Sequence, residues 1–202
     1  MINLRLYLVT DDTLARGRPL PDLVARAVAG GVTCVQLRAK RASSRAMLAQ
    51  ARELLARLRP LAVPLIVNDR LDIALAADAD GVHVGQDDLP CREVRRLTRP
   101  GFCVGVSVST VDEARAAEAE GADYLGVSPV FDTPTKADTP AATGLEGLRR
   151  IRAATRLPLV AIGGINPDNA AAVRAAGADG LAVVSAILAA DDPAAAARRL
   201  AR

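Results

Sequence analysis

Short apolar runs alternate with longer amphipathic stretches along the whole chain. The runs are rich in Val, Ile and Leu and predict eight strands, at residues 6–10, 34–38, 65–68, 81–84, 103–107, 124–130, 159–163 and 181–185. Between them, Ala-, Leu- and Arg-rich stretches place apolar residues at helical spacing. Because the strand runs are continuously apolar rather than alternating, they are typical of a parallel sheet whose outer face is covered by helices.

The spacing of these units favours a closed barrel. Eight strands in 202 residues leave about 25 residues for each strand and its helix, close to the minimum for an eightfold β/α barrel. Turns containing Gly or Asp precede the even-numbered strands, at residues 30–32, 78–81, 121–123 and 177–180, and a glycine there accepts the left-handed conformation that ends a helix. We therefore predict an α/β fold, a single-domain (β/α)8 TIM barrel that forms one catalytic domain over residues 1–202. The alternative is an open doubly wound sheet, but the glycine-rich phosphate loop of that fold does not follow the first strand.

Composition narrows the class of protein. Hydrophobic residues make up 50% of the chain, which is ample for a core and excludes a disordered or fibrous protein. Aromatic residues make up 2%, and the net charge of +3 forms no basic run, so we expect no nucleic-acid partner. The sequence shows neither an apolar run of membrane-spanning length nor a signal-peptide pattern, so we expect no membrane partner and a cytoplasmic location. The 3 cysteines are far apart and are expected to be reduced and packed in the core.

Polar residues follow the second, third and fourth strands, at the edge that carries the active site in such barrels. Gln36, Arg38 and Lys40 alternate along the end of the second strand, so their side chains point the same way. Asp69 follows the third strand and Asp88 the fourth, and neighbouring strands lie only ~5 Å apart. Two carboxylates that face two cations suit a Mg²⁺ ion carrying phosphate oxygens, so we predict Mg²⁺ at Asp69 and Asp88.

Each of these residues also has a purely structural interpretation. Either carboxylate alone is more typical of a cap on the helix that follows it. Arg38 or Lys40 alone is more typical of a solvated rim. The combination favours a binding site for phosphate. Lys40 and Lys136 are the only lysines among 26 basic residues, and both fall on loops at the edge that is expected to carry the active site.

A second anion site is predicted across the barrel mouth. Gly163-Gly164 follows the seventh strand and Val184-Ser185 the eighth, and the loops after these two strands form the recurrent phosphate site of this fold. The glycines let backbone N–H groups approach an anion, although Asn166-Pro167 is also an ordinary helix start. The long loop at residues 132–143 adds two hydroxyls and an ammonium that suit an anion, in Thr133, Thr135 and Lys136. A flexible surface excursion is the alternative for this loop.

Two further residues are weaker candidates. Ser107 ends the fifth strand and faces the mouth, where it is placed to contact a ligand. His83 lies within the fourth strand, where a packed, hydrogen-bonded core residue is more typical than a catalytic base. It is the single histidine of the chain, and nothing resembles a Ser-His-Asp or Cys-His nucleophile. Thr110 and Glu113 predict an ordinary capping box.

As an ordered set, these motifs resemble the signatures of the thiamine phosphate synthase family. The matching segments are residues 36–40, 68–70, 81–89, 105–107, 133–136, 163–165 and 184–187, which run nearly from end to end. The resemblance implies a barrel transferase of thiamine biosynthesis that joins a hydroxymethylpyrimidine diphosphate to a thiazole phosphate, giving thiamine phosphate and pyrophosphate. Dissociative loss of diphosphate from an electron-rich aminopyrimidine leaves a stabilised cation, so this chemistry needs no strong general base.

The resemblance also implies residue roles. The pyrimidine diphosphate would contact Gln36, Arg38, Lys40, Asn68, Ser107 and Lys136. The thiazole phosphate would contact Thr133, Thr135, Gly164, Val184 and Ser185. Asp69 and Asp88 would hold Mg²⁺, and the catalytic residues would be Arg38, Lys40, Lys136 and Ser107. The chain departs from residues common in the family at Ser109, Ser128 and Asp132, which affects fine positioning rather than metal or diphosphate binding.

Other functions stay open at this stage. A thiazole tautomerase of the same fold would work without a metal ion, and a non-catalytic thiamine-phosphate-binding protein would release no pyrophosphate. A sugar-phosphate isomerase would need only one phosphate site. The sequence leaves open which form of the thiazole acceptor is used and what the oligomeric state is, with a homo-oligomer allowed.

Overall fold

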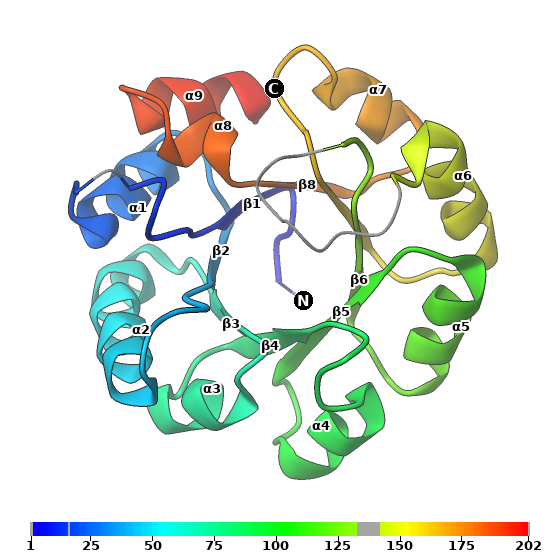
Figure 1. Cartoon of the computed structure of the whole chain (residues 1–202), viewed down its shortest axis with the longest axis horizontal. Coiled ribbons are helices and arrows are strands. Elements are labelled where there is room, and N and C mark those ends of the chain that lie inside the picture. The colour runs from blue at the N-terminus through cyan, green and yellow to red at the C-terminus, as the bar shows by residue number, and fades with distance from the viewer. Residues whose placement is uncertain (1, 16, 133–141, 202) are drawn as a thin grey trace.

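The computed structural model describes residues 2–15, 17–132 and 142–201. Eight parallel strands pair in sequence order, and β8 pairs with β1 to close a barrel (Figure 1). They are β1 Leu6–Val9, β2 Cys34–Leu37, β3 Leu65–Asn68, β4 Gly81–Val84, β5 Cys103–Val108, β6 Tyr124–Val127, β7 Leu159–Ile162 and β8 Gly180–Val183. The predicted (β/α)8 TIM barrel is confirmed, and the open doubly wound sheet is excluded because its two edge strands would stay unpaired.

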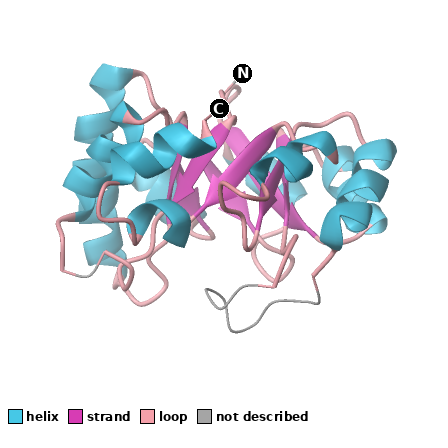
Figure 2. Cartoon of the chain, turned by 90° about the horizontal axis from the view of Figure 1, so that it is seen from above, coloured by secondary structure: helices cyan, strands magenta, loops and turns pink. Residues whose placement is uncertain are grey.

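Helices surround the barrel on its outer face (Figure 2). They are α1 Leu20–Ala29, α2 Ser44–Leu58, α3 Leu71–Ala77, α4 Cys91–Leu97, α5 Val111–Ala119, α6 Gly144–Ala154, α7 Ala170–Ala175, α8 Ser185–Leu188 and α9 Pro193–Leu200, with a 3-10 turn at Arg59–Leu61. The predicted capping box of Thr110 and Glu113 begins α5. Within the described ranges, no helix combines the length and the apolar character needed to cross a membrane.

The turns between the helices and the even-numbered strands contain the left-handed residues that the sequence predicts. Gly31, Gly121 and Gly177 precede β2, β6 and β8 with φ angles of 110°, 92° and 107°. Asp78 takes the same left-handed conformation, with φ 55°, after α3 and before β4. These tight turns place the starts of β2, β4, β6 and β8 at the bottom of the barrel, so the ends of these parallel strands converge at the opposite mouth.

Two buried layers hold the fold together. The larger lies between the strands and the helices, and the smaller fills the barrel interior with inward-facing residues such as Tyr7, Ile66 and Tyr124. Cys34, Cys91 and Cys103 are buried free thiols, which confirms the expectation for them. The inner layer matters for function because it forms the floor beneath the barrel mouth.

Candidate active site

The carboxyl ends of β2 to β5 surround a polar cavity of about 380 Å³. It brings together six of the predicted site residues, namely Arg38, Lys40, Asn68, Asp69, Asp88 and Ser107. They come from four different strands or the loops that follow them. The prediction that these side chains share one place at the barrel mouth is therefore confirmed.

Asp69 and Asp88 are the acidic pair of this cavity. The Asp69 backbone N–H donates to the His83 carbonyl at 2.8 Å, one residue beyond β3, and its φ of 63° is left-handed. Asp88 Oδ2 accepts from the Gly85 N–H at 2.7 Å. Burial, followed by the hydrogen bond and charge of Asp88, raises the pKa of Asp69 to about 6. The loops therefore hold two carboxyl groups together although their charges repel.

The capping alternative is wrong for both carboxylates. The N-cap of α3 is Arg70 and that of α4 is Pro90, and neither helix start has a side-chain capping hydrogen bond. Asp69 precedes the N-cap residue of α3 by one position. The carboxylate of Asp88 accepts its hydrogen bond from Gly85, within its own loop. Neither carboxylate is thus used to begin a helix.

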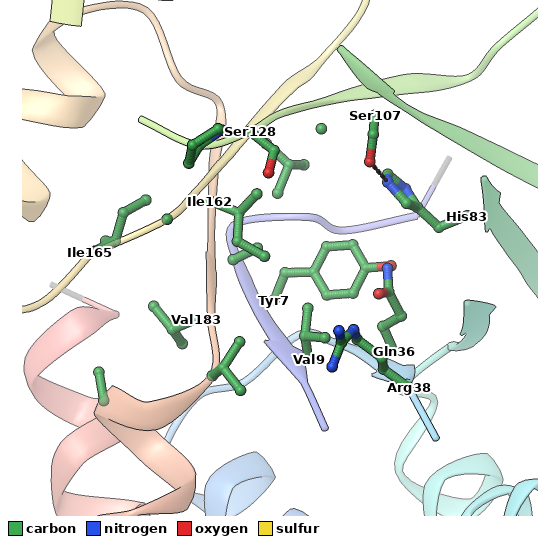
Figure 3. Close-up of a pocket in the computed structure, with 18 of the residues that line it drawn as sticks. Tyr7, Val9, Gln36, Arg38, His83, Ser107, Ser128, Ile162, Ile165 and Val183 are labelled. Atoms are coloured by element: carbon green, nitrogen blue, oxygen red, sulfur yellow. Dashed lines mark hydrogen bonds between the residues drawn. The ribbon is translucent and has the colours of Figure 1, made fainter. Parts of the chain in front are cut away.

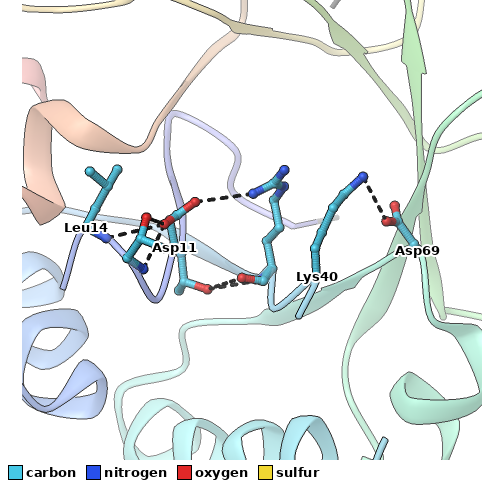
Figure 4. A network of polar contacts seen from close by, with 7 residues as sticks. Asp11, Leu14, Lys40 and Asp69 are labelled. Atoms are coloured by element: carbon cyan, nitrogen blue, oxygen red, sulfur yellow. Dashed lines mark hydrogen bonds and ion pairs between the residues drawn. The ribbon is translucent and has the colours of Figure 1, made fainter. Parts of the chain in front are cut away.

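The two predicted cations have different partners. Lys40 Nζ lies 3.8 Å from Asp69 Oδ2, and its side chain is 58% exposed (Figure 4). Arg38 Nη1 lies 3.3 Å from Asp11 Oδ2, and both of these side chains are mostly buried. Buried Arg38 Nε has no hydrogen-bond partner among the described residues, so the guanidinium keeps an unused donor.

Asp11 is a site residue that the sequence reasoning missed. It follows β1 as Asp69 follows β3, and it accepts hydrogen bonds from the backbone N–H groups of Thr13, at 2.9 Å, and Leu14, at 3.3 Å (Figure 4). These bonds fix the carboxylate that orients Arg38. Its position two residues after the end of β1, at the edge where the other site residues lie, was the available signal.

Figure 3 shows a second, more apolar cavity of about 330 Å³, which adjoins the first. The predicted residues Gln36, Gly164, Val184 and Ser185 line it, together with Ile162 and Val183. The two cavities share four lining residues, which are Arg38, Asn68, Ser107 and Ser128. One mouth therefore has a charged half and an apolar half that meet at these residues.

The backbone after β7 needs both of its glycines. Gly163 and Gly164 have φ angles of 108° and 64°, which suit glycine. A Cβ on Gly163 would lie 2.7 Å from Pro129 Cβ, and one on Gly164 would lie 2.9 Å from Phe131 Cβ. The loops after β6 and β7 therefore pack in direct contact beside the apolar cavity.

Two further expectations concern the loops after β6 and β7. The alternative interpretation of Asn166-Pro167 as a helix start is supported, because Asn166 caps the turn that leads into α7. Its Oδ1 accepts from the N–H groups of Asp168 and Asn169, and its carbonyl accepts from the Ala170 N–H at 3.0 Å. Thr133, Thr135 and Lys136 lie outside the described residues, so their roles stay predictions.

His83 is buried and hydrogen-bonded, as its position within a strand predicts. Nδ1 lies 2.9 Å from the Tyr124 hydroxyl, and Nε2 lies 2.9 Å from Ser107 Oγ. His83 also lines the apolar cavity, so this buried residue forms part of the wall of the candidate site. Tyr7 and Tyr124 line the same wall and were missed as site residues.

Comparison with known proteins decides the family. The family model for thiamine monophosphate synthase matches residues 6–187. The chain belongs to the thiamine monophosphate synthase family. Thiamine-phosphate synthase of Albidiferax ferrireducens is 59% identical over 198 residues, covering 98% of this chain and 90% of that protein. The synthase of Syntrophomonas wolfei is 55% identical over 195 residues, covering 96% and 93%.

A solved structure of a family member shows the same architecture. Thiamine phosphate pyrophosphorylase from Pyrococcus furiosus superposes with a TM-score of 0.90 at 41% identity, covering 98% of this chain and 94% of that one. As a member of the thiamine monophosphate synthase family, the chain is a transferase of thiamine biosynthesis. The resemblance noted in the sequence is therefore confirmed.

Proposed function

We propose that this thiamine-phosphate synthase joins a hydroxymethylpyrimidine diphosphate to a thiazole phosphate with the help of Mg²⁺ at Asp69 and Asp88. The observation that carries the site assignment is the pair of adjoining cavities, one charged and one apolar, that meet at Arg38, Asn68 and Ser107. A charged diphosphate fits the first cavity and a heterocycle the second.

The acidic pair has the chemistry that a divalent cation requires. Asp69 and Asp88 line the same cavity, and burial, followed by the hydrogen bond and charge of Asp88, raises the pKa of Asp69 to about 6. No group of three or more His, Cys, Asp or Glu side chains gathers anywhere in the described part of the chain. Two carboxylates with water and phosphate oxygens are the usual set for Mg²⁺. Bound there, Mg²⁺ supplies charge that neutralises phosphate oxygens.

Arg38 and Lys40 provide positive charge for the departing diphosphate. The bond between the pyrimidine CH₂ and the diphosphate oxygen breaks, and the electron pair leaves with pyrophosphate. Arg38, fixed by Asp11, and Lys40 stabilise the negative charge that accumulates on this leaving group, and Lys136 is predicted to join them. Gln36, Asn68 and Ser107 hold the pyrimidine diphosphate beside them.

The acceptor occupies the far side of the apolar cavity. Its phosphate is held by backbone groups at Gly164, Val184 and Ser185, with Thr133 and Thr135 predicted to add hydroxyls. The thiazole nitrogen then attacks the CH₂ cation and forms the new C–N bond. Since both partners are held at one mouth, proximity provides much of the remaining acceleration. No residue has to act as a strong base.

The alternatives fit this site less well. A tautomerase has no diphosphate to hold, so it gives no reason for Asp69, Asp88, Arg38 and Lys40 to converge. A non-catalytic binding protein needs no charged cavity beyond the one that holds a phosphate. A sugar-phosphate isomerase needs only one of the two cavities.

An assay with both substrates tests the proposal. Purified protein with Mg²⁺, the pyrimidine diphosphate and the thiazole phosphate is expected to release pyrophosphate and thiamine phosphate in equal amounts. Omitting the thiazole phosphate or adding excess chelator is expected to abolish the product. Full synthesis in chelator would refute the metal role, and thiamine phosphate binding without pyrophosphate release would favour the binding protein.

A further inference from the structure

A chain of hydrogen bonds crosses the floor of the apolar cavity and ends where the two cavities meet. It runs from Gln36 on β2 through Tyr7 on β1, Tyr124 on β6 and His83 on β4 to Ser107 on β5. The four distances between the bonded atoms are 3.0, 2.9, 2.9 and 2.9 Å in that order. Figure 3 shows its last contact, between His83 and Ser107. Five strands thus contribute to one continuous polar path.

The donor and acceptor capacities of the groups give this path a direction. Gln36 Nε2 donates to the Tyr7 hydroxyl, so the Tyr7 proton is free for Tyr124. Tyr124 accepts from Tyr7 and donates its own proton to His83 Nδ1. The reverse direction would leave the buried Tyr7 proton to the sulfur of Cys34, a much weaker acceptor than the Tyr124 hydroxyl. Burial raises the pKa of both phenols well above their ordinary value, so both keep the protons that they donate.

The same donor-to-acceptor direction extends through the imidazole of His83 to Ser107. Since Nδ1 accepts, the neutral ring carries its proton on Nε2 and donates to Ser107 Oγ. The Ser107 oxygen is then an acceptor toward His83, and its own proton remains for another partner. Ser107 lines both cavities, so this proton is available to a molecule bound there.

Two glycines make room for the path. His83, Gly105 and Tyr124 lie at one level of three neighbouring strands. A Cβ on Gly105 would lie 2.4 Å from the Tyr124 hydroxyl oxygen and 2.5 Å from His83 Nδ1. A Cβ on Gly126 would lie 2.8 Å from His83 Cε1. The missing side chain on β5 is what allows the rings of β4 and β6 to bond across it.

The structure assigns His83 as a positioning residue that holds the Ser107 hydroxyl as a hydrogen-bond donor toward the bound pyrimidine diphosphate. Tyr124 and Tyr7 set the imidazole tautomer that this requires. The ligand atom that Ser107 donates to is an acceptor, a ring nitrogen or a phosphate oxygen, because the bond from His83 leaves the Ser107 proton for the ligand. The inference rests on the proposed function and gives these buried groups a role in it.

Nitrogen-15 spectroscopy tests the path without any activity measurement. The chain has one histidine, so imidazole-labelled protein at neutral pH reports His83 alone. We expect the proton on Nε2 in the wild-type protein and a shift toward the other tautomer in Tyr124→Phe, which lacks the donor to Nδ1. A wild-type proton on Nδ1, or a Tyr124→Phe spectrum with an unchanged tautomer, overturns the inference.

A double-mutant cycle tests whether the path acts through Ser107. Ser107→Ala removes one hydrogen bond, which is expected to raise the KM for the pyrimidine diphosphate roughly threefold to tenfold and leave that for thiazole phosphate unchanged. Tyr124→Phe is expected to raise the same KM less, and to have no further effect in the Ser107→Ala background. Effects that multiply in the double variant overturn the inference.

A matched control separates positioning from stability. Thr155 is buried, and its hydroxyl accepts from the Leu157 N–H at 3.1 Å in the turn before β7, at the opposite end of the barrel. Thr155→Val is expected to lower the Tm while leaving both KM values unchanged. A rise in the pyrimidine KM in this variant would mean that any buried hydroxyl matters, which overturns the assignment. If wild-type protein releases no pyrophosphate, the proposed function fails while the spectra still test the path.

Discussion

At the scale of single residues, the site depends on like charges that the fold holds together. Asp69 and Asp88 are in contact, and Lys40, which lies 3.8 Å from Asp69, is largely exposed and compensates little of their repulsion. Such an arrangement is unfavourable in the free protein and becomes favourable when a cation lies between the carboxylates. The acidic pair is therefore the feature whose chemistry is most easily tested by substitution.

Neutralising either carboxylate should disable catalysis without unfolding the protein. Asp69→Asn and Asp88→Asn are each expected to lower turnover at least ~10²-fold, because the charge that offsets the leaving group is lost. Turnover and circular dichroism are measured together. Asp72→Asn is the control, since Asp72 pairs with Arg70 at the start of α3 and lies outside both cavities. Wild-type turnover in either site variant would contradict the metal role.

The raised pKa of Asp69 should appear in the pH dependence of stability. An Asp whose pKa is about 6 when folded, against an ordinary value of 3.8, binds its proton more tightly in the folded state. Its contribution to stability is thus fully present below pH 3.8 and is lost as the pH rises through about 6. Without metal, the free energy of unfolding of Asp69→Asn is expected to rise relative to wild type between these pH values. A constant difference measured by urea unfolding would show that the pKa is ordinary.

At the scale of elements, the loops after the strands build the site and the sequence predicts them unevenly. The strand runs were recognised because both of their faces are apolar, yet for the same reason the inward face could not be told from the outward one. Tyr7 and Tyr124 were therefore not recognised as residues that line a cavity. The pairing of Asp11 with Arg38 joins the ends of β1 and β2, a contact that spacing along the chain does not specify.

The close contact between the loops after β6 and β7 gives an element-scale prediction. Gly164→Ala places a Cβ 2.9 Å from Phe131 Cβ at a left-handed φ, so it should displace the loop and raise the KM for thiazole phosphate about tenfold or more. Gly101→Ala is the matched control, because its φ is 83° but no atom lies within 4 Å of the new Cβ. Both variants should lose about 1–2 kcal/mol from backbone strain. Equal KM values in the two variants would remove Gly164 from the acceptor site.

At the scale of the whole molecule, the repeated strand-and-helix units predict the fold. They do not reveal the contacts that close the barrel. Eight similar units predicted the barrel, and strand ends differed from their predicted positions by at most three residues. Closure depends on β1 pairing with β8, whose partners lie about 175 residues apart in the chain. Arg18 strengthens the same junction, donating to Ala190 O at 2.8 Å and to Leu188 O at the end of α8.

Removing the Arg18 contacts should loosen this closure. Arg18→Met keeps the aliphatic stem but leaves the carbonyls of Leu188 and Ala190 without their donor. The expected loss is about 1–3 kcal/mol in the free energy of unfolding, measured with urea. Arg26→Met on α1, whose charge has no ion pair among the described residues, is the control and should lose less than about 0.5 kcal/mol. Equal losses would show that Arg18 has no special part in closing the barrel.

The most direct measurement of the central claim is a crystal structure with Mn²⁺ in place of Mg²⁺ and the pyrimidine diphosphate bound in the absence of acceptor. Anomalous scattering then locates the ion without ambiguity. One strong peak is expected beside the carboxylates of Asp69 and Asp88, with the diphosphate next to it and within reach of Arg38 and Lys40. A bound diphosphate with no peak beside these carboxylates, or a peak held by other residues, would contradict the claim.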